Sequence, residues 1–454
     1  MFEIFKLSED ARFSNKYIIF FLLPILFEQV LVASLSFVDT FMISQLPNSE
    51  IALAGIANVA RLDTMLKQIF VALAAGGGIF VAQYIGAKRF EMANKSIKMS
   101  VMSMLIISIL VALFLEIFKV SILNFLFGKV EEAVMTESLK YYSMTILTYP
   151  FMALFNCGTA SFRSMGKSKI TLVASVCMML INIVLKYLFL FKLKIGVSGA
   201  GLSLVLAYAI TGIVIFIMLC DKSNKAYIEN PFKFEFDGSL LKRIYMVALP
   251  SGIENGLFQI GALILQTLVA SLGTVAINSN HLTTTIAALM YAPATAFTLG
   301  VLPIVSRCMG AGKCDEAEFY AKHIVKMDHV FMGLLAVIFV PLLPSILSVF
   351  KMSGEITREA VRASMVYFCA VPFLYPRSFA VPSALRGAGD TKFTMTVSVS
   401  TMFLFRIGVA YIFVKGFNLG ILSIWVAMVL DWVVRSLIFH IRFTRGKWKE
   451  HYII

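Results

Sequence analysis

Long apolar stretches separated by short polar loops recur along the whole chain. Each stretch has about 20 residues or more, the length that an α-helix needs to cross the hydrocarbon core of a bilayer. The pattern therefore predicts an all-α membrane protein with about twelve transmembrane helices. We expect the spans at residues 17–44, 51–82, 96–120, 139–162, 169–191, 197–220, 243–271, 275–306, 322–350, 361–384, 393–415 and 418–441.

The longest polar connection, residues 221–242, lies in the middle of the chain. It divides the sequence into a predicted N-lobe, residues 1–220 with the first six spans, and a predicted C-lobe, residues 243–454 with the last six spans and a tail.

Short polar motifs repeat between the two halves. Their offsets are all about 222–226 residues, and three matches in the same order are typical of a duplicated six-helix unit. Both halves contain an even number of spans and so enter the membrane in the same direction. We therefore expect two pseudo-symmetric lobes around a central cleft, an architecture that favours transport by alternating access. The matches are LPILFEQ (23–29) with LPSGIEN (249–255), IFVAQYIGAKRFEMA (79–93) with LPIVSRCMGAGKCDEA (302–317), and TASFRSMGKSK (159–169) with PSALRGAGDTK (382–392).

Composition and charge agree with a membrane protein. The 454 residues are 59% hydrophobic and only 15% charged, too little charge to cover the surface of a soluble protein of this size. The net charge of +14 comes largely from Lys and Arg in alternate loops, so the positive-inside rule explains it without a nucleic-acid partner. It predicts a multi-pass plasma-membrane protein with both termini and the central loop in the cytoplasm. The basic loops are residues 86–98, 163–169, 221–243 and 442–449.

The six cysteines show no CxxC or Cys/His spacing, so they indicate small hydrophobic residues and no metal site. The N-terminal segment MFEIFKLSEDARFSNK is amphipathic and lacks a small-residue cleavage site. We expect it to be a cytoplasmic lead-in to the first span.

Several of these motifs together resemble the multidrug and toxic compound extrusion (MATE) family, in particular its bacterial DinF-like and MepA-like branches. The resemblance covers essentially the whole chain, and the order of the motifs is more specific than any one of them. It implies twelve helices in two lobes, export of organic cations and other amphipathic compounds, and coupling to inward flow of protons or sodium ions. The motifs are LPILFEQVLVASLSFVDTFMIS, VAQYIGAKR, FRSMGKSK, LRGAGDTK and IWVAMVLDWVVRSLIFHIRFTRGKW.

Three polar residues match the family's ion-coupling site. A charge in the hydrocarbon region costs about 2.5–3.5 kcal/mol, so each one needs an explanation. Asp39, fifteen positions after Pro24, matches the acid at which DinF-like members bind the coupling ion; alternatively it is a helix-end carboxylate in contact with water. Asn156 and Asn182 match the amides that accompany this acid, and they serve equally well as ion ligands or as interhelical hydrogen-bonding groups.

Lys186 departs from the family pattern, which places an acidic residue four positions after the asparagine of the fifth span. Asn182 and Lys186 lie one turn apart and share a helix face. An ammonium group there repels Na⁺ and can pair with Asp39, which favours coupling to H⁺ over Na⁺, or a structural lock. The alternative is a lysine that snorkels to the outer surface.

Four further polar residues are candidates for a substrate cavity. Glu28 and Glu254 occupy equivalent repeat positions, where they can attract a cationic substrate or titrate, or else bond to neighbouring helices. His281 is a candidate proton carrier or a structural histidine, and Arg406 has no partner evident from the sequence. The spacings of Asp63 with Lys67 and of Asp431 with Arg435 indicate structural i,i+4 pairs.

These features together predict a secondary active exporter of small amphipathic cations that acts as a monomer in contact with membrane lipid and without a cofactor. A flippase for lipid-linked oligosaccharides or cell-wall precursors is the main alternative, because it shares this general architecture. A membrane-embedded enzyme is less favoured, since the chain has no HExxH or GxSxG motif and the glycines at 76–78 lack the lysine of a phosphate-binding loop. No catalytic residue is assigned.

Overall fold

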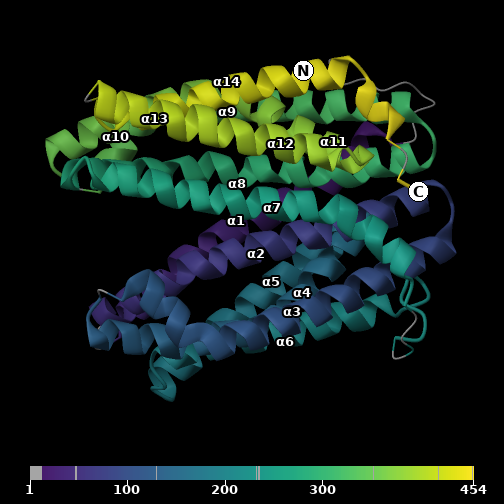
Figure 1. The fold of residues 1–454 in the computed structure, drawn as a ribbon, viewed down its shortest axis with the longest axis horizontal. Helices are drawn as coiled ribbons and strands as arrows, with labels where there is room; N and C mark the ends of the chain where they lie inside the picture. Colours follow the sequence, from purple (N-terminus) through teal and green to yellow (C-terminus); the bar gives the residue numbers. More distant parts are fainter. Residues whose placement is uncertain are drawn as a thin grey trace. The chain divides into compact units, whose positions relative to one another are not determined.

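The computed structural model describes residues 13–46, 49–128, 130–231, 233, 236–350, 352–417, 419–451 and 453–454. These residues fold as long α-helices joined by short loops, without a β-strand among them (Figure 1). The predicted lead-in, up to residue 12, lies outside the described residues. The helices of the first half are α1 (Asn15–Ser44), α2 (Ser49–Gly86), α3 (Phe90–Phe127), α4 (Glu132–Ser164), α5 (Ser168–Tyr187) and α6 (Val197–Leu219).

Among the described residues of the second half, two continuous helical runs contain three π-helical segments. α10 continues through Pro376–Ala380 into α11, and α12 continues through Met402–Gly408, α13 and Ile412–Gly416. The helices are α7 (Gly238–Ala270), α8 (Thr274–Gly310), α9 (Cys314–Ser348), α10 (Gly354–Tyr375), α11 (Val381–Ala388), α12 (Thr391–Thr401), α13 (Val409–Tyr411) and α14 (Leu422–Thr444).

Each predicted span coincides with one helix or one continuous run of helices, to within about four residues at most ends. Ten helices among the described residues are long and apolar enough to cross a membrane. α4 and the α10–α11 run complete the predicted twelve, although both are more polar. α4 packs against α2, α3, α5 and α6, so its polar side chains, such as Thr145 and Thr148, are buried against protein. A helix surrounded by other helices does not need an apolar surface on every side.

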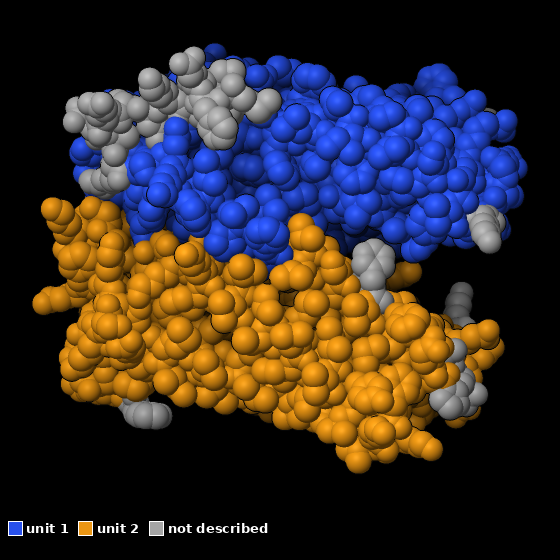
Figure 2. Space-filling view, turned by 180° about the vertical axis from the view of Figure 1, so that it is seen from behind, with its two compact units in different colours: residues 1–29, 253–454 blue, residues 30–252 orange. Residues whose placement is uncertain are grey.

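Contacts divide the chain into two compact units, shown in different colours in Figure 2. Unit 1 consists of residues 1–29 and 253–454, and unit 2 consists of residues 30–252. The change of unit falls at the end of the repeated motif of α1 and inside that of α7. The predicted lobes, residues 1–220 and 243–454, remain a prediction.

The duplicated helices pack in the same way inside each unit. In unit 2, a Cβ atom at Gly76 of α2 would lie 2.3 Å from Cβ of Ala248 on α7. In unit 1, a Cβ atom at Gly300 of α8 would lie 2.1 Å from a methyl carbon of Leu22 on α1. The two glycines are 224 residues apart and their two partners 226, which is the offset of the sequence repeat. The glycines at 76–78 therefore serve close helix packing.

Candidate functional site

Asp39 and Lys186 form an ion pair inside unit 2. Asp39 lies near the end of α1 and Lys186 near the end of α5, and the Lys186 Nζ atom is 2.5 Å from Asp39 Oδ1. The Lys186 side chain is 4% exposed and that of Asp39 is 28% exposed. The pair that the sequence suggested is therefore present, and Lys186 does not snorkel to the surface. The ammonium group is enclosed, whereas the carboxylate keeps an accessible edge.

Asn182 connects this pair to α6. Its Nδ2 atom donates to Asp39 Oδ1 at 3.4 Å, and its Oδ1 atom accepts from the Ser203 hydroxyl at 3.0 Å. Both Asn182 and Ser203 are fully buried. The amide therefore presents its N–H₂ group to the carboxylate, while its carbonyl oxygen is engaged elsewhere. Two donors, an ammonium and an amide, converge on one oxygen of Asp39.

Asn156 of α4 does not join this network. Its side-chain nitrogen is buried and has no hydrogen-bond partner among the described residues. The family resemblance implied two amides around Asp39, Asn156 and Asn182. Of these two, Asn182 contacts Asp39 in this structure and Asn156 does not.

The local fold explains why α5 and α6 meet at this point. α5 passes into a π-helical segment, Leu188–Lys192, and the chain turns at Gly196, whose φ of +70° favours glycine. A Cβ atom at Gly199 would lie 2.9 Å from Cβ of Phe189, so the first turn of α6 packs directly on this segment. The close approach places Ser203 against Asn182.

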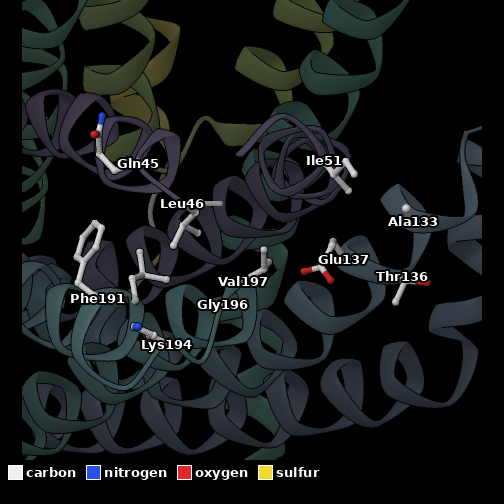
Figure 3. Close-up of a pocket in the computed structure, with 11 residues that line it drawn as sticks. Gln45, Leu46, Ile51, Ala133, Thr136, Glu137, Phe191, Lys194, Gly196 and Val197 are labelled. Atoms are coloured by element: carbon white, nitrogen blue, oxygen red, sulfur yellow. The ribbon is translucent and has the colours of Figure 1, made fainter. Parts of the chain in front are cut away.

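A cavity of about 670 Å³ opens at the same end of unit 2 (Figure 3). Its wall includes Gln45, six residues after Asp39, and Phe191, five residues after Lys186. Most of the lining is apolar, with Glu137 and Lys194 as the charged residues. Glu137 is itself paired with Lys140 on the same helix at 2.7 Å. The cavity lies beside the end of α1, and neither Asp39 nor Lys186 is part of its wall.

A second ion pair in unit 2 joins Asp63 and Lys67 of α2, with an N–O distance of 2.5 Å. It confirms the predicted i,i+4 pair.

No group of three or more His, Cys, Asp or Glu side chains arranged to hold a metal occurs in the described part of the chain.

The buried charges of unit 1 centre on Asp431 of α14. Its carboxylate is 2.8 Å from Arg406 of the π-helical segment Met402–Gly408 and 3.2 Å from Arg435 one turn along α14. Asp431 is fully buried and Arg435 is 1% exposed. The Arg435 guanidinium also lies over the ring of Phe258 at 4.9 Å and donates to the Ser398 carbonyl at 3.3 Å. Arg406, for which the sequence offered no partner, is thus part of a structural cluster.

The remaining candidates are dispersed over unit 1. Glu254 of α7 pairs with Arg386 of α11 at 3.1 Å, and both side chains are mostly buried. Glu28 is 3% exposed within α1, and His281 is exposed on α8. Glu254 therefore has the neighbouring-helix partner that was the alternative to a substrate role.

Comparison with known proteins identifies the family. The MatE family model matches the chain twice, at residues 24–188 and 250–412, and the two starts are separated by the offset of the sequence repeat. The chain belongs to the MatE family. Members of this family are transporters, many of them multidrug exporters, and not enzymes.

Two full-length relatives of this MATE family member illustrate the similarity. It is 22% identical to "Uncharacterized transporter YisQ" of Bacillus subtilis, over 94% of this chain and 93% of that protein. It is also 22% identical to "Probable multidrug resistance protein NorM" of Thermotoga maritima, over 100% of this chain and 97% of that protein.

Solved structures of MATE proteins share the fold. A MATE transporter in its bent conformation superposes with a TM-score of 0.87 at 18% identity, covering 95% of this chain and 96% of the other. A transporter from Pyrococcus furiosus, described as having a binding pocket of reversed polarity that suggests a different function, superposes with a TM-score of 0.86 at 18% identity. That match covers 96% of this chain and 97% of the other. The all-α membrane fold predicted from the sequence is thereby confirmed.

Two polar residues of this MATE family member were missed in the sequence. Ser203 of α6 was not singled out, yet its hydroxyl donates to Asn182. Asp328 of α9 was not singled out, although it is fully buried and neither carboxylate oxygen has a hydrogen-bond partner among the described residues. An acidic residue fourteen positions inside a long apolar helix is the signal that could have revealed it.

Proposed function

We propose that this chain exports small amphipathic organic cations in exchange for protons, with Asp39 and Lys186 as the pair at which the proton is exchanged. Family membership supports membrane transport of small organic compounds, and the relatives named as multidrug resistance proteins support drug-like compounds as substrates. The geometry of the Asp39 pair supports the choice of proton over sodium.

The single observation that carries the proposal is the 2.5 Å contact between the Lys186 ammonium and the Asp39 carboxylate. Sodium ions need several oxygen ligands. Here the neighbours of Asp39 Oδ1 are an ammonium and an amide N–H₂ group, while the oxygen of Asn182 accepts from Ser203. The ammonium occupies the place of a metal cation and repels one. A proton on the accessible edge of Asp39 requires no such ligand set.

Proton binding changes the charge of this site in a defined way. The resting pair carries no net charge, whereas a protonated Asp39 leaves Lys186 enclosed, charged and without its counter-ion. Such a state is unfavourable in a low-dielectric bundle, so protonation favours a different arrangement of α1 against α5. Antiport by alternating access requires two arrangements of the helices. One must be favoured when a proton is bound and the other when the substrate cation is bound.

The balance of buried charges supports the proposed substrate class. Lys67, Lys186 and Arg386 each pair with an acid of their own. Charge balance of this kind suits a cation that competes with a protein ammonium for a carboxylate. It does not suit a pyrophosphate, which requires unpaired cations.

One observation favours the second candidate function, a flippase for lipid-linked oligosaccharides or cell-wall precursors. Arg406 and Arg435 share the single carboxylate of Asp431, so this cluster carries an excess positive charge. Both guanidiniums are largely buried, which is why we rank export of cations first.

For the orientation we propose a plasma-membrane protein with both termini in the cytoplasm. Basic residues of the 86–98 and 221–243 loops support it through the positive-inside rule. In this orientation the cavity beside Asp39 opens on the outer side, from which protons enter.

The test is efflux of a fluorescent organic cation from a bacterium that lacks its own drug pumps. We expect wild-type export to stop when the proton gradient is collapsed, and Asp39→Asn to abolish it. We expect Lys186→Asp to restore an oxygen-rich site and to make export sodium-dependent. The matched control is Glu137→Gln, which removes an ion-paired carboxylate of similar exposure at the same end of unit 2 and should leave export intact.

Failure of the wild type to move any cation under either gradient would contradict the proposal. Transport of a labelled lipid-linked pyrophosphate in reconstituted vesicles would then favour the flippase.

A further inference from the structure

Asp328 is an unusual carboxylate in this chain. It lies on α9, fourteen residues after the helix begins, and it is fully buried. Neither of its oxygens has a hydrogen-bond partner, and no ion pair to it occurs, within the described part of the chain. The other buried aspartates each have a cation: Asp63, Asp390 and Asp431 pair with Lys67, Arg442 and two arginines, respectively.

The surroundings of Asp328 supply no compensating charge. α9 packs against α8, α10, α11 and the π-helical segment Pro376–Ala380. None of the charged residues on these elements forms an ion pair with Asp328 in the described part of the chain. The titratable or charged residues are His281, Tyr291, Arg307 and Cys308 on α8, Glu355, Arg358, Glu359, Arg362, Tyr367, Cys369 and Tyr375 on α10, Arg377 and Arg386 on the following segments, and Asp315, Glu316, Glu318, Tyr320, Lys322, His323, Lys326 and His329 on α9 itself. Arg386 is engaged with Glu254, and Arg377 is exposed. An isolated ionised carboxylate in such a place is far too costly, so the group carries a proton instead.

Other polar side chains lie on the same helices. Tyr375 of α10 interacts electrostatically with Asp328 and lies beside Thr298 of α8. The Thr298 hydroxyl is buried. A protonated carboxyl, a tyrosine and a threonine hydroxyl thus form a small polar island on three neighbouring helices.

The helix next to this island is broken, and the break is tied to the residue beside Asp328. Pro376 has no N–H group, so the Pro372 carbonyl cannot receive the usual helical hydrogen bond. His329 Nδ1 lies 2.6 Å from this carbonyl oxygen and, because a carbonyl only accepts, it is the donor. The π-helical segment Pro376–Ala380 begins at the same proline. Because of this hydrogen bond, movement of the segment would also displace the turn of α9 that carries Asp328.

From this geometry we propose that Asp328 is a second proton-binding site, located in unit 1, and that rearrangement of the α10 break exposes it and exchanges its proton. The site takes a proton and not a metal ion, because it offers a single carboxylate, and no cluster of three or more His, Cys, Asp or Glu side chains occurs among the described residues. Occupancy of the site stands independently of the proposed export function. Exchange of its proton during transport rests on that function.

Occupancy is tested by infrared spectroscopy of the purified full-length protein in a detergent without ester groups, at mildly alkaline pH. We expect a carbonyl stretch of a protonated carboxylic acid in the wild type and its loss in Asp328→Asn. The matched control, Asp63→Asn, removes a buried carboxylate that is paired with Lys67 and should keep the band. An identical band in wild type and Asp328→Asn would overturn the proposal.

Folding of the variant is not essential to this test. Wild-type protein grown with isotope-labelled aspartate should show the same band shifted in frequency, and an unshifted band would assign the proton to another residue type and overturn the proposal.

Exchange is tested in proteoliposomes by counting protons moved per tetraphenylphosphonium transported. We expect Asp328→Asn to transport the cation with a lower proton ratio than the wild type, whereas Asp39→Asn stops transport. An unchanged ratio in Asp328→Asn would refute exchange at Asp328 and leave the proposed function intact. A wild type that moves no protons at all would refute the proposed function, while the infrared result would still decide the occupancy of Asp328.

Discussion

Asp39 of unit 2 and Asp431 of unit 1 are both aspartates in contact with cations inside a helical bundle, and they differ in two respects. Asp39 has one cationic partner and an exposed fraction of 28%, whereas Asp431 has two arginines and no exposed surface. A one-to-one pair with an open edge can exchange a proton with water. A sealed carboxylate shared by two guanidiniums cannot do so without unfolding its surroundings, so we regard it as structural.

The comparison separates two uses of the same chemistry. Buried ion pairs add little net stability compared with apolar residues, but removal of one partner is strongly destabilising because the other charge is left uncompensated. The enclosed cluster should therefore be sensitive in folding assays. The open pair should be sensitive in transport assays.

The largest expected effect is that of Asp431→Asn. It leaves Arg406 and Arg435 buried without a counter-ion, which costs about 3–5 kcal/mol in comparable cases. We expect a large loss of folded, monodisperse protein in size-exclusion chromatography and a strongly lowered unfolding temperature. Asp39→Asn is the comparison variant: it leaves a single lysine, which can lose its proton, whereas the two arginines cannot, so we expect a smaller loss of yield. Equal losses in both variants would remove the distinction between the two sites.

A smaller effect is expected at the duplicated glycines of the two units. Gly76→Ala places a methyl group 2.6 Å from Cα of Ala248, which cannot move without shifting α7. Gly300→Ala meets only the end of the Leu22 side chain, which can change its rotamer. Overpacking costs about 1–3 kcal/mol, and we expect the full cost only in Gly76→Ala. Thermal unfolding followed by fluorescence measures the difference in unfolding temperature between the two variants. A greater lowering in Gly300→Ala would contradict our view that Ala248 is the less movable neighbour.

A mild effect on stability, but a change of coupling ion, is expected from Lys186→Asp. The substitution replaces the ammonium beside Asp39 with a second carboxylate, which attracts Na⁺. Vesicle transport driven by a sodium gradient should rise from the background level of the wild type. Sodium-driven transport that is already present in the wild type would show that Lys186 does not exclude the ion.

The smallest effect concerns a loop residue outside the bundle. The Lys95 ammonium, together with the backbone N–H of Leu240 and the Ser239 hydroxyl, holds the pKa of Asp237 below its ordinary value of 3.8. A carboxylate whose folded-state pKa is lowered stabilises the protein above 3.8, and this contribution disappears as the pH falls through the folded-state pKa. We expect Asp237→Ala to unfold at a slightly lower temperature at neutral pH, with a difference that shrinks below pH 3.8. A difference that is constant throughout the acidic range would contradict this role.

Much of the fold could be predicted from the sequence because the signals are long and repeated. Apolar stretches of membrane length located the twelve helical segments, including α4, which lies below the threshold of a simple hydropathy criterion. The repeat offset indicated that the second and eighth spans are equivalent, and Gly76 and Gly300 lie in these two spans. The close approach of Leu22 and Ala248 to these glycines depends on three-dimensional packing and was not accessible.

The candidate site was predictable where its residues lie one turn apart or follow a family motif. Asn182 and Lys186 share a helix face, and Asp39 follows Pro24 at the family spacing, so their convergence could be foreseen. The partner of Arg406 could not, because Asp431 already had Arg435 at the i,i+4 position.

Asp328 was missed because the start of its helix was predicted too far along the chain. The ninth span was predicted to begin at residue 322, which put Asp328 near a polar helix end, but α9 begins at Cys314 and carries Asp328 deep into the bundle.

Proton release on substrate binding tests the central claim most directly. Tetraphenylphosphonium is added to the purified full-length protein in weakly buffered detergent solution near neutral pH, and the pH change is recorded with an indicator dye. A substrate cation that takes the Asp39 carboxylate leaves the enclosed Lys186 ammonium without its counter-ion, so Lys186 gives up its proton. Exchange at this pair therefore predicts release of protons by the wild type and a clear reduction in Asp39→Asn, with Glu137→Gln unaffected. Equal release by the wild type and Asp39→Asn would contradict the account, because the exchanged proton would then reside elsewhere.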